Sequence, residues 1–96
     1  MRLNTKERKT ILEAIRRRDP EADVFLFGSR VRDEARGGDI DLIALSRLPL
    51  ERDRHRILDE LCDELGEQKM DLLIASSAME NSFVRMLIET RRAVPL

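Results

Sequence analysis

Apolar residues gather in three short runs along the chain, at residues 24–27, 39–45 and 70–75. The length of these runs and their content of Val, Ile, Leu and Phe predict three β-strands. The first run holds no polar residue, so we expect that strand to be buried on both faces. Because few residues connect the first run to the second, we expect these two strands to be antiparallel neighbours.

Around the strands, apolar residues recur at helical spacing. A first helix is predicted over residues 4–19, where Asn4 and Glu7 have the spacing of a capping box and Pro20 ends the pattern. The arginines at 16–18 fall in its last turn, where positive charge interacts favourably with the helix dipole. We interpret them as a solvated helix end rather than as a contact for nucleic acid.

Two further helices are expected in the second half of the chain. One opens at Leu48-Pro49, where proline is tolerated in the first turn, and ends at Gly66. The other begins with a second capping-box pattern, formed by Ser77 and Glu80, and carries a final apolar stripe.

The predicted fold class is α/β (α+β), a single domain over residues 1–96 with a small mixed sheet flanked by helices. Residues 29–34 are expected to add a short helix with Ser29 as its N-cap, and the glycines at 37–38 a turn. Residues 94–96 form either a final edge strand or a contact for a partner.

Composition narrows the function classes. Lys and Arg number 18 against 19 Asp and Glu, so the net charge of −1 creates no overall field for nucleic acid or a membrane. The chain has three Phe and no Trp or Tyr, so few aromatic side chains are available to stack on bases. We therefore expect no direct nucleic-acid binding. No apolar stretch has the length of a membrane span or the form of a signal peptide, which predicts a cytoplasmic protein. Cys62 lies on an apolar helical stripe and His55 among charged residues, so neither is assigned chemistry.

Three carboxylates interrupt the apolar strands: Asp39 and Asp41 in the second strand and Asp71 in the third. A carboxylate that faces a core is costly unless something neutralises it. Asp39 and Asp41 share a face and repel each other, and a divalent cation between them removes both problems. If the strand of Asp71 neighbours theirs, a third carboxylate joins the pair, and the three suit two Mg²⁺ or Mn²⁺ ions in phosphoryl or nucleotidyl transfer. The alternative is that Asp39 caps a turn and Asp41 pairs with an arginine.

The Gly-Ser step after the first strand is a candidate phosphate site. Gly28 permits close approach of the backbone, and Ser29 adds a hydroxyl to the N–H groups of a helix N-terminus. Arg30 and Arg32 are predicted to contact triphosphate oxygens or a negatively charged partner, while the role of Arg36 stays open. The alternatives are an ordinary loop for Gly-Ser and surface ion pairs for the arginines.

In combination, these residues resemble the DNA-polymerase-β-type nucleotidyltransferase superfamily and, more narrowly, the minimal nucleotidyltransferase (MNT) proteins. The family pattern is an apolar strand, Gly-Ser, a spacer, Asp-x-Asp and a third acid on a later strand, which Gly28, Ser29, Asp39, Asp41 and Asp71 match. The Gly-Ser-Arg-x-Arg…Ala-Arg form of the MNT branch stands at 28–36. Two features depart from the closest MNT pattern: the spacer of nine residues is one residue shorter, and position 33 is Asp where Gly is common.

The resemblance implies a minimal polymerase-β-like fold and a Mg²⁺-dependent enzyme that uses ATP. It implies that Asp39, Asp41 and Asp71 are metal ligands and catalytic residues, and that the nucleotide contacts are Gly28, Ser29, Arg30 and Arg32. MNT proteins are commonly encoded beside a HEPN-domain RNase toxin, which they neutralise by transferring AMP to a tyrosine, by binding, or by both. The chain is therefore expected to be an adenylyltransferase antitoxin. The alternatives are an antitoxin that only binds and a subunit for small-molecule nucleotidyl transfer.

Overall fold

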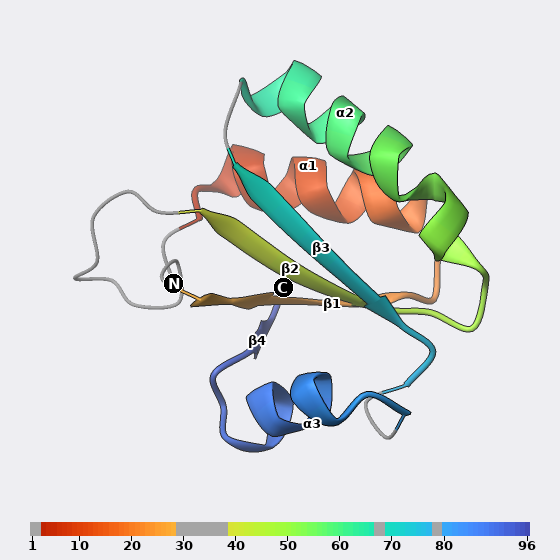
Figure 1. Ribbon diagram of the computed structural model, residues 1–96. Helices are drawn as coiled ribbons and strands as arrows, with labels where there is room; N and C mark the ends of the chain where they lie inside the picture. Colours follow the sequence, from red (N-terminus) through yellow and green to blue (C-terminus); the bar gives the residue numbers. More distant parts are fainter. Residues whose placement is uncertain (1–2, 29–38, 67–68, 78–79) are drawn as a thin grey trace.

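A computed structural model of the chain describes residues 3–28, 39–66, 69–77 and 80–96. Within these ranges, the structure has the three predicted strands, a fourth short strand near the C-terminus and three α-helices (Figure 1). The elements are, in chain order, α1 (Thr5–Arg16), β1 (Asp23–Phe27), β2 (Ile40–Leu45), the 3₁₀ turn η2 (Leu50–Asp53), α2 (Arg54–Leu65), β3 (Met70–Ala75), α3 (Ser82–Glu89) and β4 (Val94–Pro95).

The strands form one mixed sheet in the order β3-β2-β1-β4. β1 and β2 are antiparallel neighbours, as predicted, and β3 lies parallel to β2. Val94 pairs with Leu26, so the C-terminal segment is an edge strand, which decides between the two alternatives for residues 94–96. At the opposite edge, Arg54 donates a hydrogen bond from its guanidinium to the carbonyl oxygen of Leu72 and so occupies part of the open edge of β3.

Helices cover both faces of the sheet, α1 and α2 on one side and α3 on the other (Figure 1). The alternation of side chains along β1 divides the core accordingly. Val24 and Leu26 pack in the cluster with α1 and α2, and Phe25 and Phe27 pack in the cluster with α3. The expectation that this strand is covered on both faces is confirmed.

The first helix begins as predicted and ends earlier. Asn4 and Glu7 make both hydrogen bonds of the capping box, and α1 stops at Arg16 instead of continuing to residue 19. The interpretation of the following arginines as solvated is wrong for Arg18, whose side chain is 18% exposed and holds Glu60 of α2 through two hydrogen bonds of 2.9 and 3.1 Å. Arg17 stays exposed and adds a contact of 3.2 Å to the same Glu60. The arginine cluster therefore joins α1 to α2.

Two boundaries in the second half of the chain differ from the prediction. The segment after Pro49 first makes η2, and α2 then runs to Leu65, where Gly66 with φ +86° supplies the predicted stop. The proposed capping box at Ser77 and Glu80 is wrong. Asn81 caps α3 instead, because its side chain accepts a hydrogen bond of 3.0 Å from the Val84 N–H. As predicted, Cys62 packs against the core and His55 is exposed.

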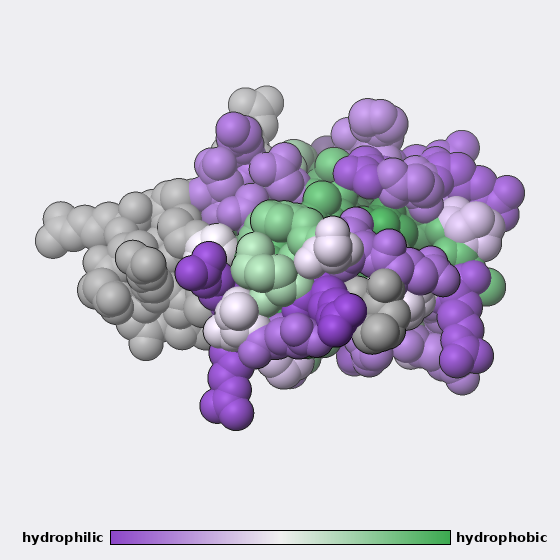
Figure 2. Space-filling model, turned by 60° about the horizontal axis from the view of Figure 1, so that its bottom comes forward, coloured by the Kyte–Doolittle hydropathy of each residue, from purple (hydrophilic) through white to green (hydrophobic). Residues whose placement is uncertain are grey.

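The face that carries α3 retains a small apolar area bordered by hydrophilic side chains (Figure 2). Phe83 and Met86 lie one turn apart on α3 and are 49% and 36% exposed. Phe83 also meets the ring of Phe27 edge-on, with centroids 6.2 Å apart. In the described parts of the chain, no helix combines the length and the apolar character that crossing a membrane requires.

Candidate functional site

Two of the predicted carboxylates stand side by side at one end of the sheet. The parallel register of β2 and β3 pairs Asp41 with Asp71, and Phe27 lies on the other side of Asp41 in β1. Neighbouring strands are about 4.8 Å apart, so two aspartates in register place their carboxylates close together. Asp71 is exposed, whereas Asp41, on the central strand, is partly buried.

Asp39, the third predicted carboxylate, precedes β2 and is paired with a cation. Its Oδ2 lies 3.7 Å from Nζ of Lys69, whose side chain is largely exposed, whereas that of Asp39 is about half exposed. The backbones are joined at the same point, because the N–H of Ile40 donates to the carbonyl oxygen of Lys69 at 3.1 Å. The structure thus brings all three carboxylates to the start of β2 and β3, with Asp39 bound to a lysine.

Gly28 lies directly against this group. Its φ of +79° is in the left-handed region, where residues with a Cβ are strained. A Cβ added to Gly28 would overlap Oδ2 of Asp41 and stand 3.2 Å from its Cγ. Glycine is therefore required here for both reasons, and the turn after β1 is in contact with the carboxylate of β2.

The neighbouring carboxylates affect the pKa of Asp41. Burial raises the pKa of its carboxyl group above the ordinary value of 3.8, and the negative charges of Asp71 and Asp39 raise it further. The positive charge of Lys69 acts in the opposite direction. The surroundings of Asp41 thus oppose its negative charge, and perturbed pKa values of this kind cluster at functional sites.

The unfavourable ionisation of Asp41 leads to a prediction for the stability of the fold. Because the pKa of Asp41 is raised in the folded protein, ionisation of this group destabilises the fold progressively as the pH rises above the ordinary aspartate value. Asp41→Asn is expected to raise the Tm by a few degrees at pH 7 in metal-free buffer, and the gain should disappear near pH 3. Thermal melts across this range measure it. Asp23→Asn, which removes a strand carboxylate at the far end of β1, controls for net charge. An unchanged Tm at pH 7 contradicts the prediction.

Two of the three carboxylates, those of Asp41 and Asp71, are suitably arranged for a divalent cation. Among the residues that the structure describes, no three His, Cys, Asp or Glu side chains converge closely enough to hold a metal ion. Asp41 and Asp71 nevertheless supply adjacent, mutually repelling oxygen donors. Mg²⁺ is commonly held in phosphate-transfer sites by one or two carboxylates, with water and substrate phosphates as the other ligands. The pair meets that requirement, and Asp39 could join it only by leaving Lys69.

Several predicted residues lie outside the described ranges. These are the nucleotide contacts Ser29, Arg30 and Arg32, together with Arg36, the short helix at 29–34 and the turn at 37–38. Of the predicted site residues, the structure therefore places four: Gly28, Asp39, Asp41 and Asp71. Their proximity does not test their catalytic role, which stays a prediction.

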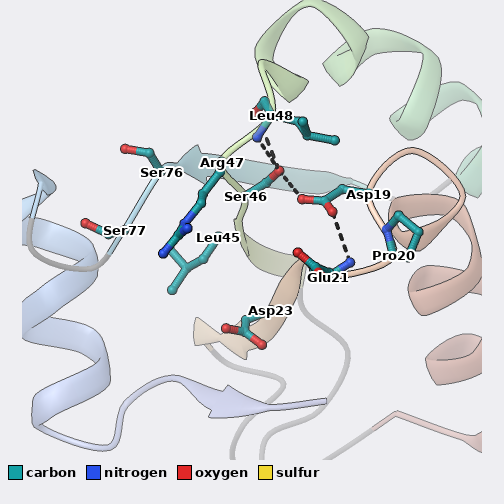
Figure 3. A pocket seen from close by; sticks show the side chains of 10 residues that line it. All are labelled: Asp19, Pro20, Glu21, Asp23, Leu45, Ser46, Arg47, Leu48, Ser76 and Ser77. Carbon is teal, nitrogen blue, oxygen red and sulfur yellow. Dashed lines mark hydrogen bonds between the residues drawn. The ribbon is translucent and has the colours of Figure 1, made fainter.

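A cavity lies elsewhere in the described part of the chain. It has a volume of about 810 Å³ and occupies the opposite end of the sheet, where Asp23 of β1 is paired with Leu45 of β2 (Figure 3). Within it, the Ser46 hydroxyl donates to Oδ2 of the buried Asp19, whose Oδ1 accepts from the Glu21 N–H at 3.0 Å. These hydrogen bonds tie the α1–β1 loop to the end of β2, so the polar groups are satisfied within the fold.

Residues 8–94 match the nucleotidyltransferase domain family. The chain belongs to this family. The match covers β1, β2 and β3, and thus the strands that carry Gly28, Asp41 and Asp71. The small mixed sheet with its helices agrees with the minimal polymerase-β-like form of the nucleotidyltransferase fold. A search of curated proteins found no match.

Among the residues that the structure describes, Lys69 lies beside the carboxylates and was missed by the sequence interpretation. It is a lysine between a predicted helix stop and a predicted strand, and nothing in the local pattern distinguishes it from a solvated residue. A signal was available in the parallel pairing. Once residues 40 and 70 are aligned, positions 39 and 69 are neighbours with opposite charges.

Proposed function

We propose that this nucleotidyltransferase is a Mg²⁺-dependent adenylyltransferase that transfers AMP from ATP to a tyrosine hydroxyl of a partner HEPN-domain toxin. Membership of the family supports nucleotidyl transfer as the chemistry. The observation that carries the assignment of the site is the Asp41–Asp71 pair with Gly28 against it. The antitoxin role and the identity of the partner rest on the resemblance to MNT proteins.

The proposed reaction divides work between the carboxylates. Asp41 and Asp71, joined by Asp39, would hold the cation, which supplies Lewis-acid stabilisation of charge on the phosphates. The acceptor oxygen forms a bond to the α-phosphorus, the bond to the β-phosphate oxygen breaks, and pyrophosphate leaves. Asp71, the exposed carboxylate of the pair, would accept the hydroxyl proton. Gly28 and Ser29, with Arg30 and Arg32, would bind the β- and γ-phosphates.

A purely binding antitoxin is the second candidate. The exposed apolar side chains of Phe83 and Met86 favour it, because apolar residues that remain exposed on a helix are available to a protein partner. In this alternative the carboxylates are a remnant and inhibition of the toxin needs only the surface. A small-molecule nucleotidyltransferase subunit is the remaining alternative.

The experiment that separates these functions uses ATP labelled at the α- or the γ-phosphate. The chain is incubated with MgCl₂ and the HEPN protein encoded beside it, and the partner's intact mass and label are measured. We expect the α-label to appear on the partner with the mass of one or more AMP groups, and no transfer of the γ-label. An inhibited but unlabelled partner would support the binding antitoxin, and a γ-label would contradict nucleotidyl transfer.

A further inference from the structure

Lys69 lies beside the three carboxylates of Asp39, Asp41 and Asp71, which we call the acidic group. No part of the proposed reaction uses this lysine. It directly precedes β3, as Asp39 directly precedes β2, so the parallel register of the two strands sets these residues next to each other. The backbone hydrogen bond between the Ile40 N–H and the Lys69 carbonyl fixes the main chain at this point. The strand pairing thus makes the two residues neighbours, and Nζ of Lys69 lies 3.7 Å from Oδ2 of Asp39.

Lys69 supplies the charge that the acidic group lacks. Asp39, Asp41 and Asp71 place three carboxylates at one end of two neighbouring strands, where like charges repel one another. Lys69 brings a positive charge to this end of the sheet, with its Nζ 3.7 Å from Oδ2 of Asp39. Its side chain is 73% exposed, so the ammonium group can leave Asp39 without disturbing the core.

We propose that Lys69 is a positioning residue that acts as the counter-ion of the acidic group in the metal-free protein and competes with the divalent cation for Asp39. The inference rests on the proposed metal-dependent function. With a cation bound, Asp39 would contact the metal in place of the ammonium group, and the side chain of Lys69 would extend into solvent. Lys69 thereby keeps Asp39 close to the other two carboxylates and at the same time weakens metal binding.

The test measures Mn²⁺ binding by electron paramagnetic resonance, without any turnover. Lys69→Gln is expected to bind Mn²⁺ about three- to tenfold more tightly than the natural chain, because the substitution removes a positive charge that repels the divalent ion. Lys69→Arg keeps the charge and should bind like the natural chain. Lys9→Gln is the matched control, because it breaks a similarly exposed ion pair, with Glu13 at 4.0 Å on α1.

The possible outcomes separate this inference from the proposed function. Equal or weaker Mn²⁺ binding by Lys69→Gln, with binding intact in the natural chain, overturns the role of Lys69 alone. Tighter binding in both Lys69→Gln and Lys9→Gln also overturns it, because the effect would then follow net charge. If the natural chain binds no Mn²⁺, the metal-dependent function fails and the competition proposed for Lys69 fails with it.

Discussion

Gly28→Ala is expected to lower nucleotidyl transfer by about a hundredfold or more, even though it adds a single methyl group. The new Cβ would overlap Oδ2 of Asp41, so the carboxylate must move away from its place beside Asp71. Displacement of a catalytic group by about 1 Å is enough for a loss of that size. The rate of AMP transfer at saturating ATP and MgCl₂, with circular dichroism as a check of the fold, measures the effect.

Gly66→Ala is the matched control for this substitution. Gly66 also has a positive φ, of +86°, but no atom lies within 4 Å of the Cβ that alanine would add. Both variants should therefore lose stability from backbone strain, on the order of 1–3 kcal/mol. Only Gly28→Ala should lose transfer beyond what its reduced stability explains. Equal residual rates in the two variants would mean that the contact with Asp41 has no functional role.

The strands could be predicted because their apolar runs are short, continuous and bounded by glycine or charge. Residues 24–27 and 70–75 are recovered within one residue, and the β1–β2 pairing follows from the shortness of the connection. The capping box of Asn4 could be predicted because it depends only on Asn4 and on Glu7, three residues later. Ser77 and Glu80 match the same local pattern, but Asn81 lies next to the helix start and provides the cap instead.

The arrangement of the site depended on information that is not local. The sequence places Asp71 on a later strand, but its position opposite Asp41 requires β3 to lie parallel to β2 and in one particular register. The same register brings Lys69 to Asp39, and neither residue indicates this pairing by its neighbours in the chain. Arg18 was likewise misinterpreted, because its partner Glu60 is on another helix.

Asp41→Asn is expected to have the largest effect on the reaction. The substitution removes a negative donor from the centre of the acidic group while it preserves the shape of the side chain. Loss of a cation that stabilises the phosphates by several kcal/mol corresponds to about a thousandfold or more in rate. Asp23→Asn is the matched control, since Asp23 is also a strand aspartate and lies at the opposite end of the sheet. Its transfer rate should equal that of the natural chain.

The location of the cation tests the account most directly, and NMR with paramagnetic Mn²⁺ in the presence of ATP can measure it. We predict that Mn²⁺ selectively broadens the amide signals of Gly28, of the start of β2 and of the start of β3, both in the natural chain and in Asp23→Asn. Asp41→Asn should lose this pattern. Broadening confined to the cavity at the opposite end, around Ser46 and Ser76, or an unchanged pattern in Asp41→Asn, would contradict the assignment of the acidic group as the nucleotidyl-transfer site.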